Sequence, residues 1–204
     1  MDYAFHIYNQ YASDGASMAI DSLLKADIRK KLTEKKNAEF RKQFDGNLNK
    51  PPVVVCIGSD LAVGDSLGPI TGSMLKYKTQ GLGVFIYGTL SAPVTAKEVR
   101  YLKTFLKETH PSSQIIAVDA AVGAEGDIGL IKLIHAPLYP GAGANKKLGA
   151  VGDISIMGIV AEKSVANYGL LNTTRLNLVY SMSEIISDAL SNVLWQRRQT
   201  QSAK

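Results

Sequence analysis

Short apolar runs alternate with amphipathic stretches along most of the chain. The first run, 53–57, is rich in β-branched residues and has no polar alternation, which is typical of a strand buried on both faces. Apolar residues at helical spacing predict helices in the intervening stretches. The predicted strands are 53–57, 84–89, 114–119, 128–134 and 154–160, and the predicted helices are 17–36, about 69–79, about 95–109, and from Asn172 or Thr173 to about 196.

This alternation predicts a three-layer α/β/α sandwich around a mixed, mostly parallel five-stranded sheet. The link between the third and fourth predicted strands is too short for a helical crossover, so 128–134 should run antiparallel. Residues 51–204 are interpreted as one domain and 1–50 as a helical extension. Its first 15 residues carry four aromatic side chains and could be a docking arm, a short helix or partly disordered.

The composition favours a globular protein over a membrane-spanning, secreted or nucleic-acid-binding one. An apolar fraction of 46% with 20% charged residues is typical of a globular domain, and no apolar run approaches the ~20 residues that span a bilayer. The N-terminus lacks the pattern of a signal peptide, and Cys56 is the single cysteine, so a reducing cytoplasmic setting is expected. The net charge of +5 arises within 25–42. A solvated helix face explains this basic segment better than a nucleic-acid surface does.

Two aspartates are the candidate catalytic residues. Asp119 ends the predicted strand 114–119, and Asp65 lies in the loop after the strand 53–57. Parallel strands bring both positions to the carboxyl edge of the sheet, where two carboxylates can share a proton and act as general acid and general base. The alternative is that Asp119 caps its strand or a turn and that Asp65, with Ser66, caps the next helix.

Two glycine-rich loops are the candidate substrate-binding segments. The first does not match a phosphate-binding loop, because its spacing differs and an aspartate replaces the lysine, and it lacks the dinucleotide fingerprint. The second, 139–153, could bind a substrate backbone or an oxyanion, or could simply be a surface loop. Asp153 could cap the next strand or orient this loop. The candidate substrate-binding residues are Gly58, Ser59, Asp60, Gly64, Ser66, Gly141, Gly143, Asn145 and Lys146.

No metal or other cofactor is expected. The three histidines, His6, His110 and His135, show no paired spacing, and only His135 is expected near the site. His110 precedes a proline and is interpreted as a helix end. Cys56 is expected to be a buried packing residue, and Trp195 a core or interface residue.

Three motifs carry a resemblance that covers about residues 52–162: IGSDLAVGDSLGP, IIAVDAA and YPGAGANKKLGAVGDISIMGIV. They resemble the YyaC-type sporulation proteins, which are also labelled spore proteases. More distantly they resemble the spore germination protease and the hydrogenase maturation endopeptidases. The catalytic aspartates of the germination protease would correspond to Asp65, in GDSLGP, and Asp119, in AVDAA, with Gly64 in place of a proline. Its P-G-S-G-x-x-N segment is similar to residues 140–145.

The resemblance implies a sheet in the order 2-1-3-5-4 with the fourth strand antiparallel, a cytoplasmic location in a spore-forming bacterium, and a peptide or protein as substrate. In the hydrogenase maturation enzymes the corresponding acids bind nickel together with a histidine, which has no clear counterpart here. Three functions therefore stay open: an aspartate-dependent endopeptidase, a metal-dependent maturation-type peptidase, and a non-enzymatic protein-binding module. A homo-oligomer is also compatible with the aromatic N-terminus and Trp195.

Overall fold

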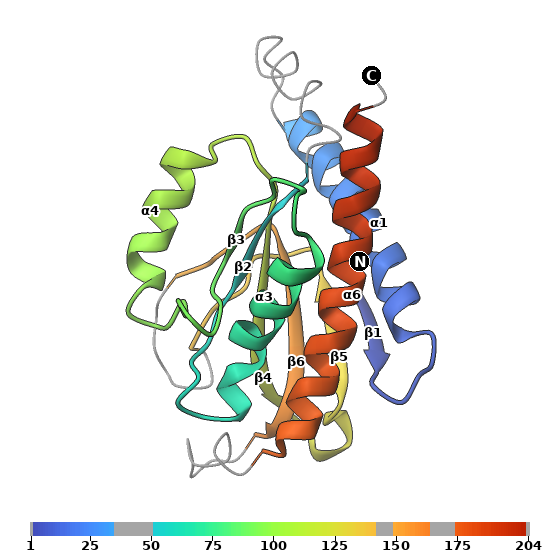
Figure 1. The fold of residues 1–204 in the computed structure, drawn as a ribbon, viewed down its shortest axis with the longest axis vertical. Coiled ribbons are helices and arrows are strands. Elements are labelled where there is room, and N and C mark those ends of the chain that lie inside the picture. Colours follow the sequence, from blue (N-terminus) through green and yellow to red (C-terminus); the bar gives the residue numbers. More distant parts are fainter. Residues whose placement is uncertain (1, 35–50, 142–148, 164–173, 203–204) are drawn as a thin grey trace.

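A computed structural model describes residues 2–34, 51–141, 149–163 and 174–202. The described chain forms a mixed α/β fold around a six-stranded sheet in the order β1-β5-β6-β4-β2-β3 (Figure 1). The strands are β1 (Asp2–His6), β2 (Val53–Cys56), β3 (Ile86–Tyr87), β4 (Ile115–Gly123), β5 (Leu130–Ile134) and β6 (Ile154–Glu162). The helices are α1 (Ala12–Glu34), α3 (Leu67–Lys78), α4 (Val99–Thr109) and α6 (Leu176–Ser202), with short 3-10 helices η1 (Gly64–Ser66) and η2 (Glu125–Asp127).

The order of the five predicted strands is confirmed. Strands β3, β2, β4 and β6 are parallel neighbours, and β5 pairs antiparallel with β6, as the short link before β5 predicts. The prediction of a five-stranded sheet is wrong, because β1 adds a sixth strand that pairs antiparallel with β5. Tyr3 and Phe5 of β1 are half-buried against the core, so this N-terminal segment is a strand and not a loose arm.

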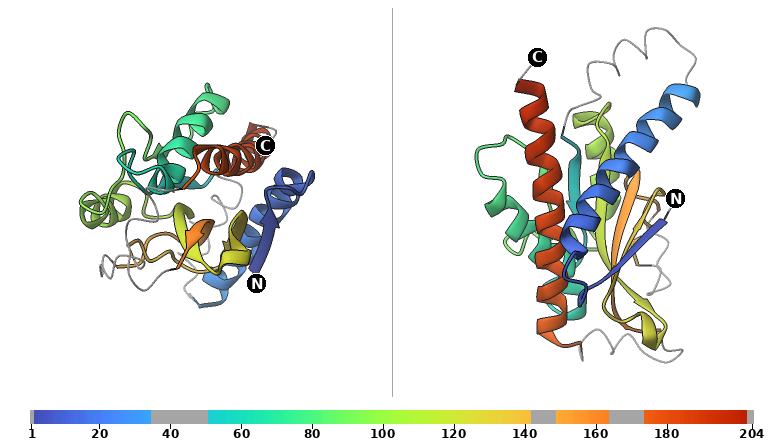
Figure 2. Two further views of the ribbon diagram at one scale, coloured as in Figure 1. Left: turned by 90° about the horizontal axis from the view of Figure 1, so that it is seen from below. Right: turned by 90° about the vertical axis from the view of Figure 1, so that its right-hand side faces the viewer.

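Helices lie on both faces of the sheet, in unequal numbers (Figure 2). Helices α1, α3 and α6 share one hydrophobic cluster with alternate residues of β2, β4, β5 and β6. Helix α4 covers the opposite face, where Leu102 and Leu106 join Val53 and Val55 of β2 in a second cluster. Successive residues of β2 therefore pack alternately into the two clusters. Because both faces of β2 are buried, the sequence of this strand is apolar throughout.

Helix α1 contributes to the main core. Ile20, Leu23 and Leu24 are completely buried, and the helix packs against α6. Residues before position 35 thus share a core with the strands that follow position 51. The rest of the basic segment, 35–42, lies outside the described residues, as do the predicted caps Asn172 and Thr173.

Most element boundaries differ from the predictions by a few residues, and two differences affect the site. Strand β3 is only two residues long, and β4 continues beyond Asp119 to Gly123. Of the helices that the structure describes, none is both long enough and apolar enough to cross a membrane.

Candidate active site

Asp119 lies where β4 loses one of its two neighbours. Strand β2 pairs with β4 only as far as Cys56, which lies opposite Val118, whereas β4 stays paired with β6 through Gly123. The prediction that the strand ends on Asp119 is therefore wrong. Asp119 nevertheless lies at the carboxyl edge of the sheet, as expected from the sequence. Asp119 sits just beyond the carboxyl end of β2, and its half-buried side chain accepts a hydrogen bond from the backbone N–H of Ala120 (2.9 Å).

Asp65 reaches the same edge from the loop that follows β2. It belongs to η1, directly before α3, and its side chain is half-buried. The backbone N–H of Ser59 donates to the carbonyl oxygen of Asp65 (3.0 Å), and the N–H of Gly58 donates to the carbonyl oxygen of Val94 (3.0 Å). These bonds close the loop between Gly58 and Asp65 and attach its first residue to the segment that leads into α4.

Close contact between α3 and the end of β2 fixes the position of this loop. A Cβ atom on Gly68 would lie 2.0 Å from the carbonyl oxygen of Ile57, and one on Gly58 would lie 2.1 Å from that of Asp65. Gly58 also has a φ of 145°, which side chains rarely permit. The two glycines therefore let α3, and Asp65 with it, approach the strand end more closely than any other residues would allow.

The electrostatics of the pair follow from this placement. Burial raises the pKa of Asp119 well above its ordinary value, and the negative charge of Asp65 raises it further. The hydrogen bond from Ala120 opposes this shift in the pKa without cancelling it. A carboxyl group that keeps its proton beside an ionised carboxylate can serve as a general acid, and its neighbour as a general base.

The capping alternative gains no support at Ser66. Ser66 occupies the position before the first residue of α3 but makes no capping hydrogen bond with its side chain. Its buried hydroxyl donates instead to the carbonyl oxygen of Val63 (2.6 Å).

The other candidates from the first loop differ in their surroundings. The Ser59 hydroxyl oxygen accepts a hydrogen bond from the N–H of Leu61 (3.2 Å), while Asp60 is exposed. Gly64 is buried at the start of η1. In the second loop Gly141 is half-buried with a φ of 70°, and Gly143, Asn145 and Lys146 lie outside the described residues.

His135 is not near the aspartate pair, contrary to expectation. It follows β5, and because β5 is antiparallel to β4 and β6, its carboxyl end lies at the opposite edge of the sheet. There its Nε2 lies 3.4 Å from the buried Asp27 of α1. His110 is the C-terminal cap of α4, as predicted, and its Nε2 lies 2.8 Å from the Tyr87 hydroxyl.

Sequence reasoning missed the network around Asp27. Asp27 accepts a hydrogen bond from the Gln114 amide (2.8 Å) and pairs with Lys31 (3.0 Å), which also pairs with Asp153 (2.7 Å). Asp153 accepts in addition from the N–H of Ile115 (2.8 Å), so it anchors the starts of β6 and β4 to α1. Burial lowers the pKa of Lys31, but the two carboxylates outweigh it and the net shift is upward.

The described residues form no metal centre, and the one cysteine is not placed to act as a nucleophile. Within the described ranges, no three His, Cys, Asp or Glu side chains come together as metal ligands. Cys56 is completely buried, as predicted, and burial raises the pKa of its thiol to about 12. A thiolate nucleophile at this position would be strongly disfavoured.

Comparisons with known proteins identify similar chains without an assigned activity. Residues 25–189 match the model of a family described as "Protein of unknown function (DUF1256)". The chain is 36% identical over 184 residues to "Uncharacterized protein YyaC" of Bacillus subtilis (strain 168), covering 90% of this chain and 82% of that protein. No solved structure matches.

Proposed function

We propose that this chain, which belongs to the DUF1256 family of proteins of unknown function, is an endopeptidase that uses Asp65 and Asp119 as a proton-sharing pair. The observation that carries the proposal is the placement of Asp65 and Asp119 at the same carboxyl edge of the sheet, where burial and the charge of Asp65 raise the pKa of Asp119. Strongly perturbed carboxyl groups of this kind are concentrated at catalytic sites.

In the proposed reaction the two carboxyl groups have different tasks. Asp65, as the carboxylate, removes a proton from a water molecule that attacks the carbonyl carbon of the scissile peptide bond. Asp119, as the acid, donates its proton to the nitrogen of the leaving amine when the tetrahedral intermediate collapses. Backbone N–H groups of the loop after β2 are candidates to hold the substrate carbonyl, since glycine-rich backbone permits close approach.

A protein-binding module without catalysis is the second candidate. Leu61 lies four residues before Asp65 with 90% of its surface exposed, and Leu90, in the loop after β3, is 46% exposed. Exposed leucines near a candidate site favour contact with another polypeptide, whether it is cleaved or only bound. A metal-dependent peptidase would need ligands besides the two aspartates, because catalytic zinc sites usually have three protein ligands.

The proposal extends to the setting of the protein. We place the chain in the cytoplasm of a spore-forming bacterium, acting on a protein or peptide during sporulation, because its motifs resemble the spore proteases. The order β3-β2-β4-β6-β5 with β5 antiparallel supports a three-layer fold of the hydrogenase-maturation-protease type. Self-association is part of the proposal and can be measured by analytical ultracentrifugation.

The test is cleavage of a mixed peptide library followed by mass spectrometry, with wild type, Asp65→Asn, Asp119→Asn and Asp14→Asn compared. Either site variant should reduce cleavage at least about 100-fold, the lower range for losing an acid or base. Asp14→Asn, which replaces an exposed aspartate of α1 outside the candidate site, should keep full activity. Undiminished cleavage by Asp119→Asn would refute the proposal. Activity that is abolished by a chelator and restored by nickel or zinc would favour the metal-dependent alternative.

A further inference from the structure

Helix α4 carries a row of three cations on its exposed surface, next to the side that it buries. Arg100, Lys103 and Lys107 are all exposed, whereas Leu102 and Leu106 anchor the helix in the core. Residues three and seven positions apart lie on one side of a helix. At a rise of 1.5 Å per residue the row is about 10 Å long.

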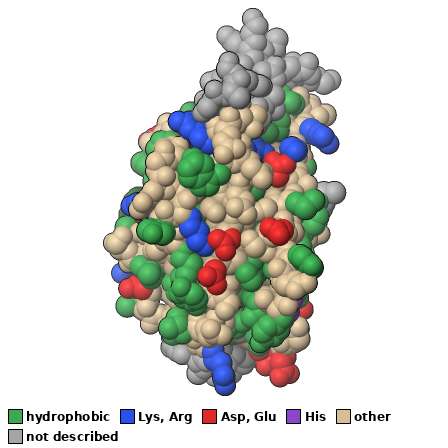
Figure 3. Space-filling model, turned by 45° about the vertical axis from the view of Figure 1, so that its right-hand side comes forward, with side chains coloured by type: hydrophobic (Ala, Val, Ile, Leu, Met, Phe, Trp, Pro, Cys, Tyr) green, Lys and Arg blue, Asp and Glu red, His purple; other side chains and the backbone are tan. Residues whose placement is uncertain are grey.

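The row lacks counter-charges. Among the described residues, no carboxylate lies within ion-pair distance of Arg100, Lys103 or Lys107. Several cations elsewhere are paired, including Lys78 with Asp188 (2.7 Å) and Lys132 with Asp127 (2.8 Å). Figure 3 shows another side of the molecule, where acidic and basic side chains lie next to one another. The charge of the α4 row is therefore not compensated in the way that the charges of these paired cations are.

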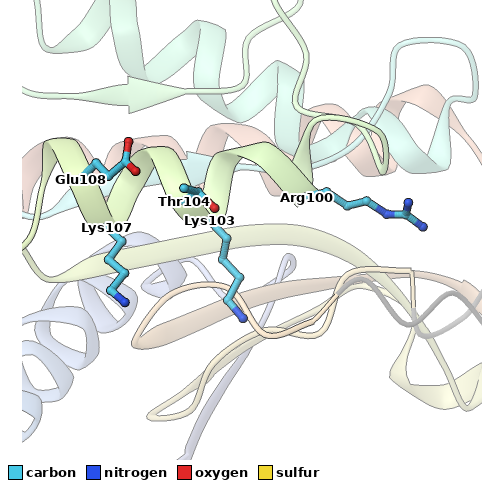
Figure 4. A pocket seen from close by; sticks show the side chains of 5 residues that line it. All are labelled: Arg100, Lys103, Thr104, Lys107 and Glu108. Atoms are coloured by element: carbon cyan, nitrogen blue, oxygen red, sulfur yellow. The ribbon is translucent and has the colours of Figure 1, made fainter.

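The cations line a hollow. Arg100, Lys103, Thr104, Lys107 and Glu108 line one side of an open surface hollow of about 600 Å³ beside α4, a volume within the range of small-ligand sites. Figure 4 shows Lys103 and Lys107 extending to the same side of the helix. A Cβ atom on Gly149 would lie 3.5 Å from the Lys103 ammonium nitrogen, so the segment before β6 reaches this side chain.

We propose that this hollow binds a small multivalent anion, an elongated molecule with at least two phosphate or carboxylate groups. The lining supplies three cationic groups and the Thr104 hydroxyl as donors, and Arg100 can hold an oxyanion with two hydrogen bonds. The spacing of the cations requires charge at more than one point along the ligand. Among the described residues of the lining, Glu108 is the one acid, and its charge disfavours the bound anion. The site is separate from the aspartate pair and does not depend on peptidase activity.

Isothermal titration calorimetry with tripolyphosphate at low salt tests this site in the full-length chain. The triple variant Arg100→Gln/Lys103→Gln/Lys107→Gln should bind tripolyphosphate about ten-fold or more weakly, because it loses three exposed ionic contacts with the anion. The variant Lys25→Gln/Arg29→Gln/Lys76→Gln removes the same charge from α1 and α3 and should bind nearly as the wild type does. Glu108→Gln should bind more tightly, which an effect on folding alone would not produce.

Three results would overturn the proposal. The first is no heat of binding with wild type at millimolar tripolyphosphate. The second is equal weakening in both triple variants, which would mean that net charge alone attracts the anion. The third is much tighter binding of a single-stranded oligonucleotide that depends on the same three residues, because the surface would then serve a nucleic acid.

Discussion

Replacing Asp119 with Asn should stabilise the protein, and the gain should grow as the pH rises. In the folded chain, burial and the charge of Asp65 raise the pKa of Asp119 above its value in the unfolded chain. At pH values between these two pKa values, the folded state binds more protons than the unfolded state. The free energy of unfolding therefore falls as the pH increases through this range. Because Asn cannot ionise, the Asp119→Asn variant should not show this fall in the free energy of unfolding with rising pH.

The size of the effect is limited by proton linkage. For a single group, the free energy of unfolding changes by at most about 1.4 kcal/mol per pH unit, beginning near the ordinary aspartate pKa of about 3.9. Asp119 is only half-buried, so solvent screening limits its pKa shift and thereby the pH range over which this slope acts. The side-chain amide oxygen of Asn can accept the hydrogen bond that the Ala120 N–H donates to Asp119 in the wild type (2.9 Å), so the substitution can preserve this contact.

Urea unfolding followed by circular dichroism at pH 4, 5, 6 and 7 would measure the difference between variant and wild type. The two proteins should be nearly equal at pH 4, with Asp119→Asn progressively more stable above it. Asp60→Asn, the exposed control, should stay within about 0.5 kcal/mol of wild type at every pH. A difference that does not change with pH, or a variant that is less stable at pH 7, would refute the electrostatic reasoning.

Three further predictions concern the framework of the site. Gly68→Ala should lower the free energy of unfolding by about 1–3 kcal/mol, because its Cβ would lie 2.0 Å from a backbone oxygen, whereas Gly126→Ala, with open space around it, should cost little in an equilibrium urea titration. Asp27→Ala should lower the free energy of unfolding by about 3 kcal/mol in the same titration, because it leaves buried partners unpaired. Its control, Asp188→Ala, breaks a partly exposed ion pair and should lower the free energy of unfolding by less than about 1 kcal/mol. Cys56 should react with a thiol reagent only as fast as the chain opens, and rapid labelling of the native protein would contradict its complete burial.

The sequence was most informative where local patterns determine structure. Five strands followed from alternating apolar runs, and the antiparallel direction of β5 followed from one short link. The order of the five strands was implied by the resemblance, and the structure confirms it. The approximate site of Asp119 followed from its place in the apolar run 114–119. The continuation of β4 to Gly123 was missed because small residues give little periodic signal, and pairing with β6 maintains this part of the strand.

The missed features depend on contacts between distant residues. Strand β1 gains its partner from β5, more than 120 positions away, although the inward-facing Tyr3 and Phe5 show the alternation of a strand. Asp27 lies among basic residues and was interpreted as part of a solvated face. Its burial depends on Gln114 and His135, which only the folded chain brings to α1.

The most direct test of the paired-carboxylate account is the pKa of Asp119, measured by carbon-detected NMR titration in wild type and in Asp65→Asn. The resonance can be assigned by its absence in Asp119→Asn. The account predicts a pKa well above the ordinary aspartate value in wild type and a lower one in Asp65→Asn, still raised because burial is the larger cause. An ordinary pKa in wild type, or one that Asp65→Asn leaves unchanged, would show that the two carboxyl groups do not act as a pair.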